Sequence, residues 1–438
     1  MAHFLTKALA SAVATGMIGV MAASAQAAEP DWSKVPVKSV KLFYPGQSSS
    51  QWLRSTEHKQ GNKQVPAGRA CVSCHENDET DIGNVVVKGG RLEPNPIPGK
   101  QGTIDLAVQA AYDSKNAYLR FQWKTRNPHP GDAHPYLRFN GKEWKSYGGP
   151  RLDGDVREAK QPALYEDRLA LMIDDGKVEN FAVHGCWVTC HDGLRDMPKA
   201  AKPEDVAANP LLGQTLKKSE VRKFLPPTRT GESWDSTRSP DEIAKLKAAG
   251  GFLDLMQWRA HRSNPVGMAD DGYVLEYRLS DDGKDVFASN KDKKTHQPKY
   301  MYDAKKVGVK AIRTEDLHQP GKPQHLILET NGVAFDPMAG WKDGDMIPEY
   351  VVSRAQAAGS AADNADVKGV WKDGMWTVVW VRPLNLANPD DKAFREGGVY
   401  NVGMAVHDDN ITTRGHHVSF PVSLGFGAKA DIQAVKVE

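Results

Sequence analysis

The placement of the cysteines constrains this chain more than any other feature. The 438 residues include only four cysteines, in two close pairs, and a histidine directly follows each pair. Residues 71–75 read Cys-Val-Ser-Cys-His, and residues 186–191 read Cys-Trp-Val-Thr-Cys-His. Histidine accounts for 14 residues of the chain, so its presence after both pairs is not expected by chance. A disulfide framework in a chain of this length would normally use its cysteines differently.

The first motif is the attachment signature of a c-type haem. Its spacing suits that chemistry because two thiols form thioethers with the porphyrin vinyl groups while the adjacent histidine supplies the proximal nitrogen to the iron. The second motif has one more residue between its cysteines, which a looser loop accommodates. We therefore expect two covalently bound haem c groups. The candidate residues are the four thiols and the two proximal iron ligands: Cys71, Cys74, Cys186, Cys190, His75 and His191.

Two other interpretations of the cysteine pairs are open. Four thiolates can bind zinc, although zinc does not explain the histidine after each pair. Each pair can also form a redox-active disulfide, although the thioredoxin type of this motif belongs to a βαβ setting that the sequence does not show.

The first 27 residues have the pattern of a signal peptide. Lys7 supplies a positive charge, residues 8–23 form a short apolar stretch, and residues 25–27 (Ala-Gln-Ala) form a cleavage signal. We expect cleavage before Ala28 and export to the periplasm, with an uncleaved membrane anchor as the alternative. No later run of about 18 apolar residues occurs, so we expect a chain that does not span the membrane after cleavage.

Charge and length narrow the possibilities further. The chain has 57 basic and 55 acidic residues, a formal net charge of +2, which gives no electrostatic reason to expect a nucleic-acid partner. The length allows two or three domains, or one large β-sandwich with an additional segment.

Apolar residues alternate along several segments after residue 100, as they do in strands with one buried face. Residues 104–110 and 119–123 follow this pattern on either side of a turn at 113–116, which predicts a hairpin. Residues 370–379 predict a second hairpin around Asp373-Gly374, a dipeptide suited to a type I′ turn. Alternation also predicts strands over 400–406 and 418–424. These features predict a mainly β fold, an antiparallel β-sandwich.

Helix signals are scarcer. Ser239 is a suitable N-cap, with Pro240 at the first helical position and Glu242 completing a capping box. The predicted helix continues through Leu246 and stops at Gly250-Gly251. Residues 353–367 are rich in Ala, Ser, Asn and Gly, which predicts a surface linker or insertion.

Several segments in and around the second motif resemble the ethylbenzene dehydrogenase-related haem-binding domain. The resemblance covers about residues 100–428, and the order and spread of its segments carry it. The segments are 165–172 (YEDRLALM), 184–191 (HGCWVTCH), 254–260 (DLMQWRA), 264–271 (NPVGMADD), 369–376 (GVWKDGMW) and 382–384 (RPL).

This resemblance implies a haem-binding β-sandwich. The family is known as the electron-transferring γ subunit of molybdenum enzymes related to dimethyl sulfoxide reductase, and also in stand-alone cytochromes. The γ subunits hold a non-covalent b-type haem with methionine and lysine ligands, whereas residues 186–191 of this chain place a covalent motif in the methionine region. The chain therefore resembles a c-type dihaem branch. We expect a sandwich over residues 100–430 that carries the second haem, preceded at 28–99 by a short, mostly irregular or helical c-type haem segment.

The resemblance also suggests a distal ligand for the second haem. Where the γ subunits place their lysine, this chain has Arg-Gly-His-His-Val-Ser at residues 414–419. Adjacent residues of a strand face opposite sides, so only one of His416 and His417 can enter the haem pocket from a regular strand. We favour His416, and the alternative is that both histidines are surface residues.

The first haem is less constrained. His58, thirteen residues before Cys71, is the first candidate for its distal ligand, and a methionine ligand is also open. Further candidates are His129, His134 and His261. We expect His184 to support its neighbouring motif rather than to bind iron. Trp52, Trp187 and Trp258 are candidates for lining the porphyrins or for ordinary core packing.

These expectations favour a periplasmic dihaem electron carrier of a respiratory chain over an enzyme. Its partners would be redox proteins: a quinol-oxidising membrane cytochrome, other periplasmic cytochromes or a molybdenum oxidoreductase. Two alternatives are a haem enzyme, a peroxidase or small-oxyanion reductase with one open distal position, and a haem-based sensor.

Overall fold

The computed structural model describes residues 29–438 except 281–284, 387, 409–410 and 412–413. The signal peptide expected at residues 1–27 lies outside the described residues. No helix in the described part of the chain combines the length and the apolar character that crossing a membrane requires.

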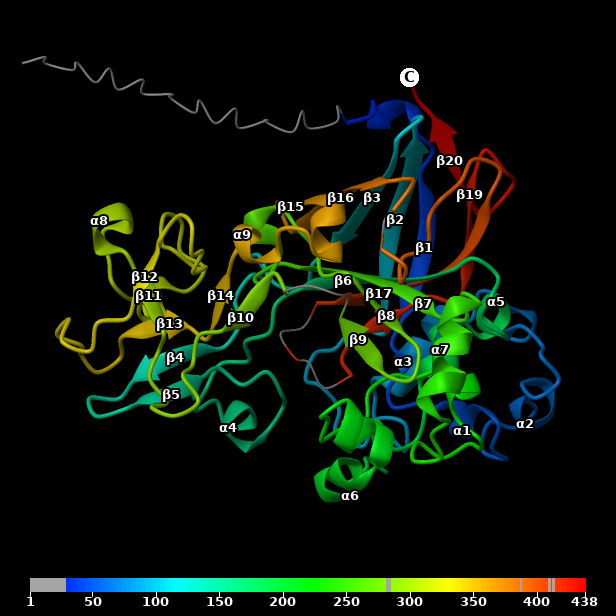
Figure 1. Cartoon of the computed structure of the whole chain (residues 1–438), viewed down its shortest axis with the longest axis horizontal. Coiled ribbons are helices and arrows are strands. Elements are labelled where there is room, and N and C mark those ends of the chain that lie inside the picture. Colours follow the sequence, from blue (N-terminus) through cyan, green and yellow to red (C-terminus); the bar gives the residue numbers. More distant parts are fainter. Residues whose placement is uncertain (1–28, 281–284, 387, 409–410, 412–413) are drawn as a thin grey trace, which may run out of the picture.

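A thirteen-stranded, mostly antiparallel sheet folds into two packed layers among the described residues (Figure 1). One layer has the order β15-β16-β3-β2 and the other has the order β17-β6-β7-β8-β9. The pair β1-β18 joins the layers at one end, and the pair β20-β19 joins them at the other. The strands are β1 (Lys38–Phe43), β2 (Thr103–Tyr112), β3 (Asn116–Lys124), β6 (Arg168–Asp174), β7 (Leu253–Arg259), β8 (Gly272–Val274), β9 (Arg278–Ser280), β15 (Asp366–Lys372), β16 (Met375–Pro383), β17 (Val399–His407), β18 (His417–Val418), β19 (Val422–Phe426) and β20 (Ile432–Lys436).

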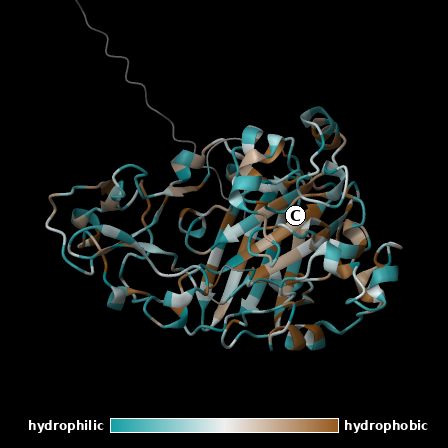
Figure 2. Cartoon of the chain, turned by 90° about the horizontal axis from the view of Figure 1, so that it is seen from below, coloured by the Kyte–Doolittle hydropathy of each residue, from teal (hydrophilic) through white to brown (hydrophobic). Residues whose placement is uncertain are grey.

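The main core lies between these two layers. Alternate side chains of the facing strands meet around a void of only about 10 Å³, so the layers are closely packed. Figure 2 shows the hydrophobic residues concentrated on these strands, with hydrophilic residues on the surrounding loops and short helices. The residues around the void are Val108, Leu119, Phe121, Leu171, Ile173, Val402, Met404, Leu424 and Ile432. The predicted mainly β sandwich is confirmed.

Both predicted hairpins are present. β2 and β3 pair from Ala107↔Gln122 to Tyr112↔Ala117 around the turn at 113–116. β15 and β16 pair around Asp373 and Gly374, whose φ angles of 51° and 78° are those a type I′ turn requires.

The strand predicted over 418–424 is interrupted. β18 ends at Val418 and β19 begins at Val422, with Phe420 and Pro421 between them. Proline has no backbone N–H to donate to a neighbouring strand, which explains the interruption. The break allows Phe420 to pack against Phe43 and Trp187.

The predicted helix is α7 (Pro240–Ala248), with the capping box of Ser239 and Glu242 formed in both directions. The other α-helices are short, and several of them surround the N-terminal segment and the second motif (Figure 1). They are α1 (Ser50–Leu53), α2 (Gly61–Gln64), α3 (Glu79–Val86), α4 (Gly154–Arg157), α5 (Phe181–His184), α6 (Pro203–Ala208), α8 (Ala304–Val307) and α9 (Arg354–Ala357).

The N-terminal segment shares the sheet of the sandwich. β1 is paired with β2 from Lys38↔Val108 to Phe43↔Thr103, and it also contacts β18. The boundary that the sequence places near residue 100 therefore falls between two strands that are hydrogen-bonded to each other.

A second lobe extends from the sandwich, on the left in Figure 1, and the sequence did not predict it. It has its own apolar core, which includes Tyr136, Trp144, Tyr302, Met346 and Ile347. Its strands are β4 (Tyr136–Phe139), β5 (Trp144–Tyr147), β10 (Phe287–Ser289), β11 (Tyr300–Tyr302), β12 (Gly332–Ala334), β13 (Met346–Pro348) and β14 (Tyr350–Val352).

Residues 353–367 are not the surface linker that their composition predicted. Ala357 and Ala361 are almost fully buried, and the last two residues belong to β15. The small side chains permit close packing here, because Ala357 and Ala362 contact Met268, Val286 and Val352.

Candidate haem sites

The first motif lies on the wall of a mainly apolar cavity of about 760 Å³. Cys71 begins a short 3-10 turn that ends at Ser73, and the backbone N–H groups of Cys74 and His75 both donate to the carbonyl of Cys71. This turn brings the two thiols and His75 to one side of the cavity. Apolar residues that complete the wall include Trp52, Leu53, Val65, Ile82, Val86, Trp187 and Phe420.

Two histidines line this cavity with their rings nearly parallel. The ring centroids of His58 and His75 are 6.0 Å apart, with an interplanar angle of 14°. Nδ1 of His58 is 2.8 Å from the carbonyl oxygen of Leu53, and Nδ1 of His75 is 3.4 Å from Oδ2 of Asp78. Each contact fixes one ring nitrogen and leaves Nε2 available as a ligand, an arrangement typical of metal-binding histidines.

The spacing of these rings fits one iron between them. With metal–nitrogen bonds of about 2 Å, two axial imidazoles have centroids roughly 6 Å apart. The residues of the first cavity therefore fit a haem with His75 and His58 as axial ligands. His129, His134 and His261 do not line this cavity. They belong to a histidine cluster at the second lobe. There the ring centroids of His261 and His134 are 5.9 Å apart, and the ring of His129 stacks on that of His318.

The second motif is held against β17. Gly185, with φ of 56°, begins a 3-10 segment that ends at Thr189, and the N–H of Cys190 donates to the carbonyl of Trp187. A side chain at Gly403 of β17 would place its Cβ 3.9 Å from Cβ of Cys186. Gly403 therefore lies directly against Phe181 and Cys186, where an added Cβ would be at ordinary contact distance.

A second cavity, of about 170 Å³, lies on the outer face of the sandwich layer formed by β17, β6 and β7. Alternate residues of each strand line it, and the intervening residues face the core. Cys186, Leu194, Val221 and Arg222 cover it from the other side. The outward strand residues are Gly403, Ala405 and His407 on β17, Arg168, Ala170 and Met172 on β6, and Leu255 and Gln257 on β7; Met404 of β17 also reaches the lining.

His416 and His417 point to different environments. His416 lines the second cavity together with Cys186, whereas Nε2 of His417 lies 2.8 Å from the carbonyl oxygen of Gln101. His417 is buried and His416 is half-buried, and neither is exposed, which argues against the alternative that both are surface residues. The placement favours His416 as a ligand, and that role stays a prediction.

His407 is a third histidine at this site, half-buried, and it was not among the histidines predicted from the sequence. Its ring centroid is 5.3 Å from that of His416, and its Nδ1 has no hydrogen-bond partner among the described residues. Burial lowers the pKa of His407 well below its ordinary value, aided by nearby Arg168 and His416. The available signal was the alternation along β17, which places His407 on the face opposite Val406.

His191 is turned away from the second cavity in this structure. Its Nε2 lies 2.9 Å from the carbonyl oxygen of Val188 and 3.1 Å from that of Phe224, and its ring stacks on Phe224. Iron ligation by His191 would require its side chain to rotate, so its proximal role stays a prediction. His184 does not line either cavity, and its Nε2 contacts the carbonyl oxygen of Arg69 at 3.1 Å.

The Cys190 thiol lies in a cationic environment. Nη2 of Arg414 is 2.7 Å and Nζ of Lys223 is 3.6 Å from its sulfur. Burial alone would raise the pKa of Cys190, but these two cations lower it to about 7. They therefore favour the thiolate, which is the reactive form of cysteine.

The two motifs meet in one apolar cluster. Cys71 and Cys186 both contact the cluster of Phe43, Trp187 and Phe420. The backbone N–H of Ser50 also donates to the carbonyl of Cys190 at 2.6 Å, which ties the N-terminal segment to the second motif. The two candidate haem sites are therefore adjacent parts of one structure.

The zinc and disulfide interpretations do not fit this arrangement. All four cysteines are free thiols. In the described part of the chain, three or more metal-ligating side chains come close enough to hold one ion only at Asp254, Asp271 and Asp391. Those carboxylates surround the guanidinium of Arg382, whose pKa they raise against the effect of burial.

The segments that resemble the haem-binding family also meet in the fold. Asp254 accepts a hydrogen bond from Nη2 of Arg382 at 2.6 Å, and both side chains are buried. Trp376 donates through Nε1 to Oδ2 of Asp167 at 2.8 Å. Trp258 packs in the main core and not at either cavity. The quoted segments thus supply structural contacts that hold the layers behind the second site.

The protein is a β-sandwich in which Cys71, Cys74 and His75 line one cavity and Cys186 of the second motif lines another, an arrangement compatible with a haem-binding β-sandwich protein. The profile of the family described as ethylbenzene dehydrogenase matches residues 29–419, and the chain belongs to this family. The match begins in the N-terminal segment, earlier than the sequence resemblance indicated.

Two relatives of this chain are named cytochromes. The chain is 29% identical over 434 residues to "Cytochrome c-552" of Stutzerimonas stutzeri, which covers 99% of this chain and 98% of that protein. It is also 29% identical over 244 residues to "Cytochrome c-551" of Rhodocyclus tenuis, covering 55% of this chain and 86% of that protein. Similarity to the first of these two cytochromes therefore spans nearly the whole chain.

Proposed function

We propose that this protein is a periplasmic dihaem c-type cytochrome that transfers electrons between redox partners in a respiratory chain. The observation that carries the proposal is that the first motif lines one cavity with His58, and that Cys186 of the second motif lines an adjacent cavity with His407 and His416. Haem iron supplies one-electron chemistry when bound, and the protein sets its potential and access through ligands, burial and hydrogen bonds.

The chain's own residues have distinct roles in this proposal. Cys71, Cys74, Cys186 and Cys190 attach the two groups. His75 and His58, oriented by Asp78 and the Leu53 carbonyl, bind the first iron. His191 is the proximal ligand of the second iron after rotation of its side chain, and His416 is the distal ligand.

The first site has an accessible edge. Cys74 is exposed, and 41% of the surface of Val72 is accessible, whereas the thiols of the second motif are more deeply buried. Electrons therefore enter or leave at the first site, where a redox protein can approach. The proposed partners are a quinol-oxidising membrane cytochrome, another periplasmic cytochrome or a molybdenum oxidoreductase.

The location follows from residues 1–27, whose pattern is that of an export signal. Haem attachment through thioethers is also compatible with an oxidising, exported compartment, because the attachment occupies thiols that would otherwise tend to oxidise there.

Ligand-binding spectroscopy of the holo-protein tests the carrier function. We expect both haems to be six-coordinate and low-spin, and neither to bind carbon monoxide rapidly when reduced. A five-coordinate haem that binds carbon monoxide or cyanide rapidly and turns over peroxide or an oxyanion would instead support the haem enzyme.

A further inference from the structure

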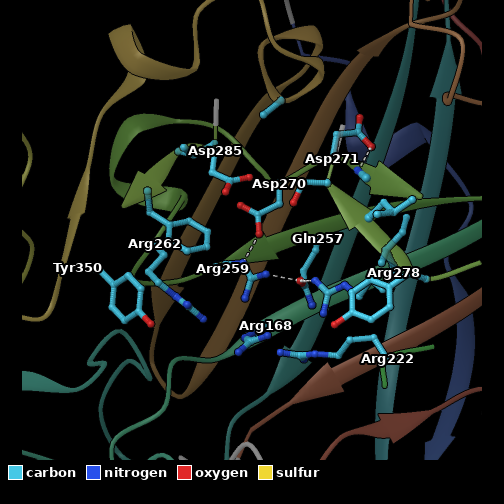
Figure 3. Close-up of a pocket in the computed structure, with 18 of the residues that line it drawn as sticks. Arg168, Arg222, Gln257, Arg259, Arg262, Asp270, Asp271, Arg278, Asp285 and Tyr350 are labelled. Carbon is cyan, nitrogen blue, oxygen red and sulfur yellow. Dashed lines mark hydrogen bonds and ion pairs between the residues drawn. The ribbon is translucent and has the colours of Figure 1, made fainter. Parts of the chain in front are cut away.

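A large cationic chamber adjoins the second haem site. It has a volume of about 730 Å³ and lies over β7, β8 and β9, where Figure 3 shows its arginines gathered around Gln257. Nine cationic side chains and five carboxylates line it. The cations are Arg151, Arg168, Arg195, Lys217, Lys218, Arg222, Arg259, Arg262 and Arg278.

Some of these arginines have a carboxylate partner. Nε of Arg262 donates to Oε1 of the fully buried Glu166 at 2.6 Å. Arg259 forms an ion pair with Asp270. Glu220 is shared between Arg195 and Arg222. These pairs use two of the chamber's own carboxylates, Asp270 and Glu220, and the buried Glu166 outside its lining.

Arg168 and Arg278 are left without comparable partners. Nε of Arg168, whose side chain is 7% exposed, has no hydrogen-bond partner among the described residues, and its nearest carboxylate is Glu166 at 3.6 Å. Arg278 forms no ion pair with a described carboxylate, and its Nη2 donates to the neutral Oε1 of Gln257 at 2.5 Å. The same amide oxygen accepts from Arg259.

The environment of Arg278 reflects this excess of positive charge. Burial, together with the neighbouring Arg259 and Arg222, lowers the pKa of Arg278 to about 9. Buried cations are costly unless a counter-charge and hydrogen bonds compensate them. Planar or multi-oxygen anions are the best counter-charges for a buried guanidinium, because the guanidinium binds them through two parallel hydrogen bonds.

We propose that this chamber binds an anion with paired oxygen atoms, a carboxylate or small oxyanion, between Arg168, Arg222 and Arg278. Figure 3 shows the three side chains directed toward the same part of the chamber. They come from β6, from the segment after the second motif and from β9, so the fold assembles them from distant parts of the chain.

Two sources can supply this anion. Arg168, Arg222 and Arg278 line both the chamber and the second haem cavity, so the carboxylates can be the propionates of the second haem. This source rests on the proposed function. The other source is an anion that diffuses in from solution, and it does not depend on the haem.

The test compares the holo-protein with its Arg278→Gln and Arg168→Gln variants, and with Arg157→Gln as a control. Arg157 is an exposed arginine of α4 that does not line the chamber. Oxalate and sulfate serve as probes in calorimetric titrations at constant ionic strength set with chloride. Haem content and the midpoint potential of each haem are measured on the same samples.

The free-anion source is supported if the protein binds oxalate or sulfate and this binding weakens at least tenfold in Arg278→Gln and Arg168→Gln. The binding should be unchanged in Arg157→Gln. Absence of binding, with a fall in the midpoint potential of one haem in these variants alone, supports the propionates, because loss of a nearby cation disfavours the reduced haem. If folded variants that retain two haems show neither of these results, the proposal is overturned.

The outcome for the chamber is separable from that for the proposed function. Anion binding by a protein with fewer than two haems would refute the dihaem assignment and leave the chamber intact. If a glutamine variant does not fold, Arg278→Lys keeps the charge and removes the paired donors. The Arg278→Lys variant should weaken anion binding or lower one midpoint potential. If its anion affinity and both midpoint potentials equal those of the wild type, the proposal is overturned.

Discussion

At the scale of single residues, His58 is prepared for ligation by its backbone surroundings. Its Nδ1 faces the Leu53 carbonyl, its ring stacks on Trp52 at 5.0 Å, and its Nε2 is left for the cavity. Such contacts fix both the tautomer and the ring orientation before a metal binds. His58 was already the first candidate from its position before Cys71, but the contact that orients its ring could not be predicted, because it depends on the turn that follows α1.

Replacement of His58 should change one haem and leave the other intact. In His58→Ala, the loss of the distal nitrogen is expected to convert the first haem from a low-spin to a high-spin or ligand-exchangeable form. Magnetic circular dichroism and the near-infrared charge-transfer bands measure this change.

His129→Ala provides the control for that experiment, because His129 lies outside the first cavity. Unchanged axial signatures in His58→Ala would contradict the assignment of His58.

His261 is a buried histidine whose pKa is shifted mainly by burial. It is fully buried, its Nδ1 contacts the Asp132 carbonyl at 2.7 Å, and His325 and Arg262 lie nearby. Burial, reinforced by His325, lowers the pKa of His261 to about 3. In the unfolded chain, a histidine takes up its proton near pH 6.5.

Stability should therefore fall as pH decreases from about 6.5 toward 3, because the unfolded chain binds a proton at His261 that the folded chain does not. His261→Gln removes this contribution, so its free energy of unfolding should depend less on pH, by up to about 1.4 kcal/mol per pH unit. Urea unfolding at a series of pH values measures the slope. The exposed His296→Gln is the control, and equal slopes in His261→Gln and wild type would refute the argument.

At the scale of elements, β17 serves two surfaces at once. Val402, Met404 and Val406 pack in the sandwich core, while Gly403, Ala405 and His407 face the second cavity. Small residues at the first two outward positions leave space for a flat group beside Cys186. The third position adds an imidazole to the same wall.

Filling this space should displace the second haem without unfolding the sandwich. In Gly403→Val, the added methyl groups enter the cavity, and the haem content is expected to fall from two to about one per chain. Haemochrome spectra measure the content and far-ultraviolet circular dichroism the fold.

Asn401→Val, on the same strand and outside the cavity lining, should retain both haems. Full haem content in Gly403→Val would show that the cavity is not the second haem site.

The sequence predicted those strands and helices whose signals lie within a few neighbouring residues. Alternation identified β2, β3, β16 and β17, and the capping residues identified α7, because each signal lies within a few residues. The second lobe escaped prediction because β10 to β14 have only three residues each, too few for a period to be recognised. The interrupted strand at Pro421 shows one residue overriding an otherwise regular alternation.

The candidate site was predictable only in part for the same reason. The thiols and adjacent histidines are contiguous in sequence, so their motifs are visible without a structure. His407 and the arginines of the chamber are not, because Arg168 and Arg278 become neighbours only when β6, β7 and β9 assemble. The tertiary packing decides which outer face of a sheet is covered, and the local sequence does not show it.

At the scale of the whole molecule, the sandwich forms the centre, and separate parts of the chain pack on its different sides. The second lobe extends from one side, and the N-terminal segment and the second motif pack together on another (Figure 1). The hydrogen bond from Ser49 Oγ to Asp192 Oδ1 at 2.7 Å adds to the backbone contact between these two parts. The two segments proposed to carry the haems, distant in sequence, thus pack together, which favours electron transfer between the two proposed sites.

The central claim is that this single chain carries two covalently attached haems. Denaturing intact-mass spectrometry after acid–acetone extraction, combined with a pyridine haemochrome assay, measures that number directly in protein matured in a periplasm. We predict a chain that begins at Ala28 and retains the mass of two haems, with one lost in Cys71→Ser/Cys74→Ser and one in Cys186→Ser/Cys190→Ser. A chain that retains one haem or none after extraction would contradict the claim.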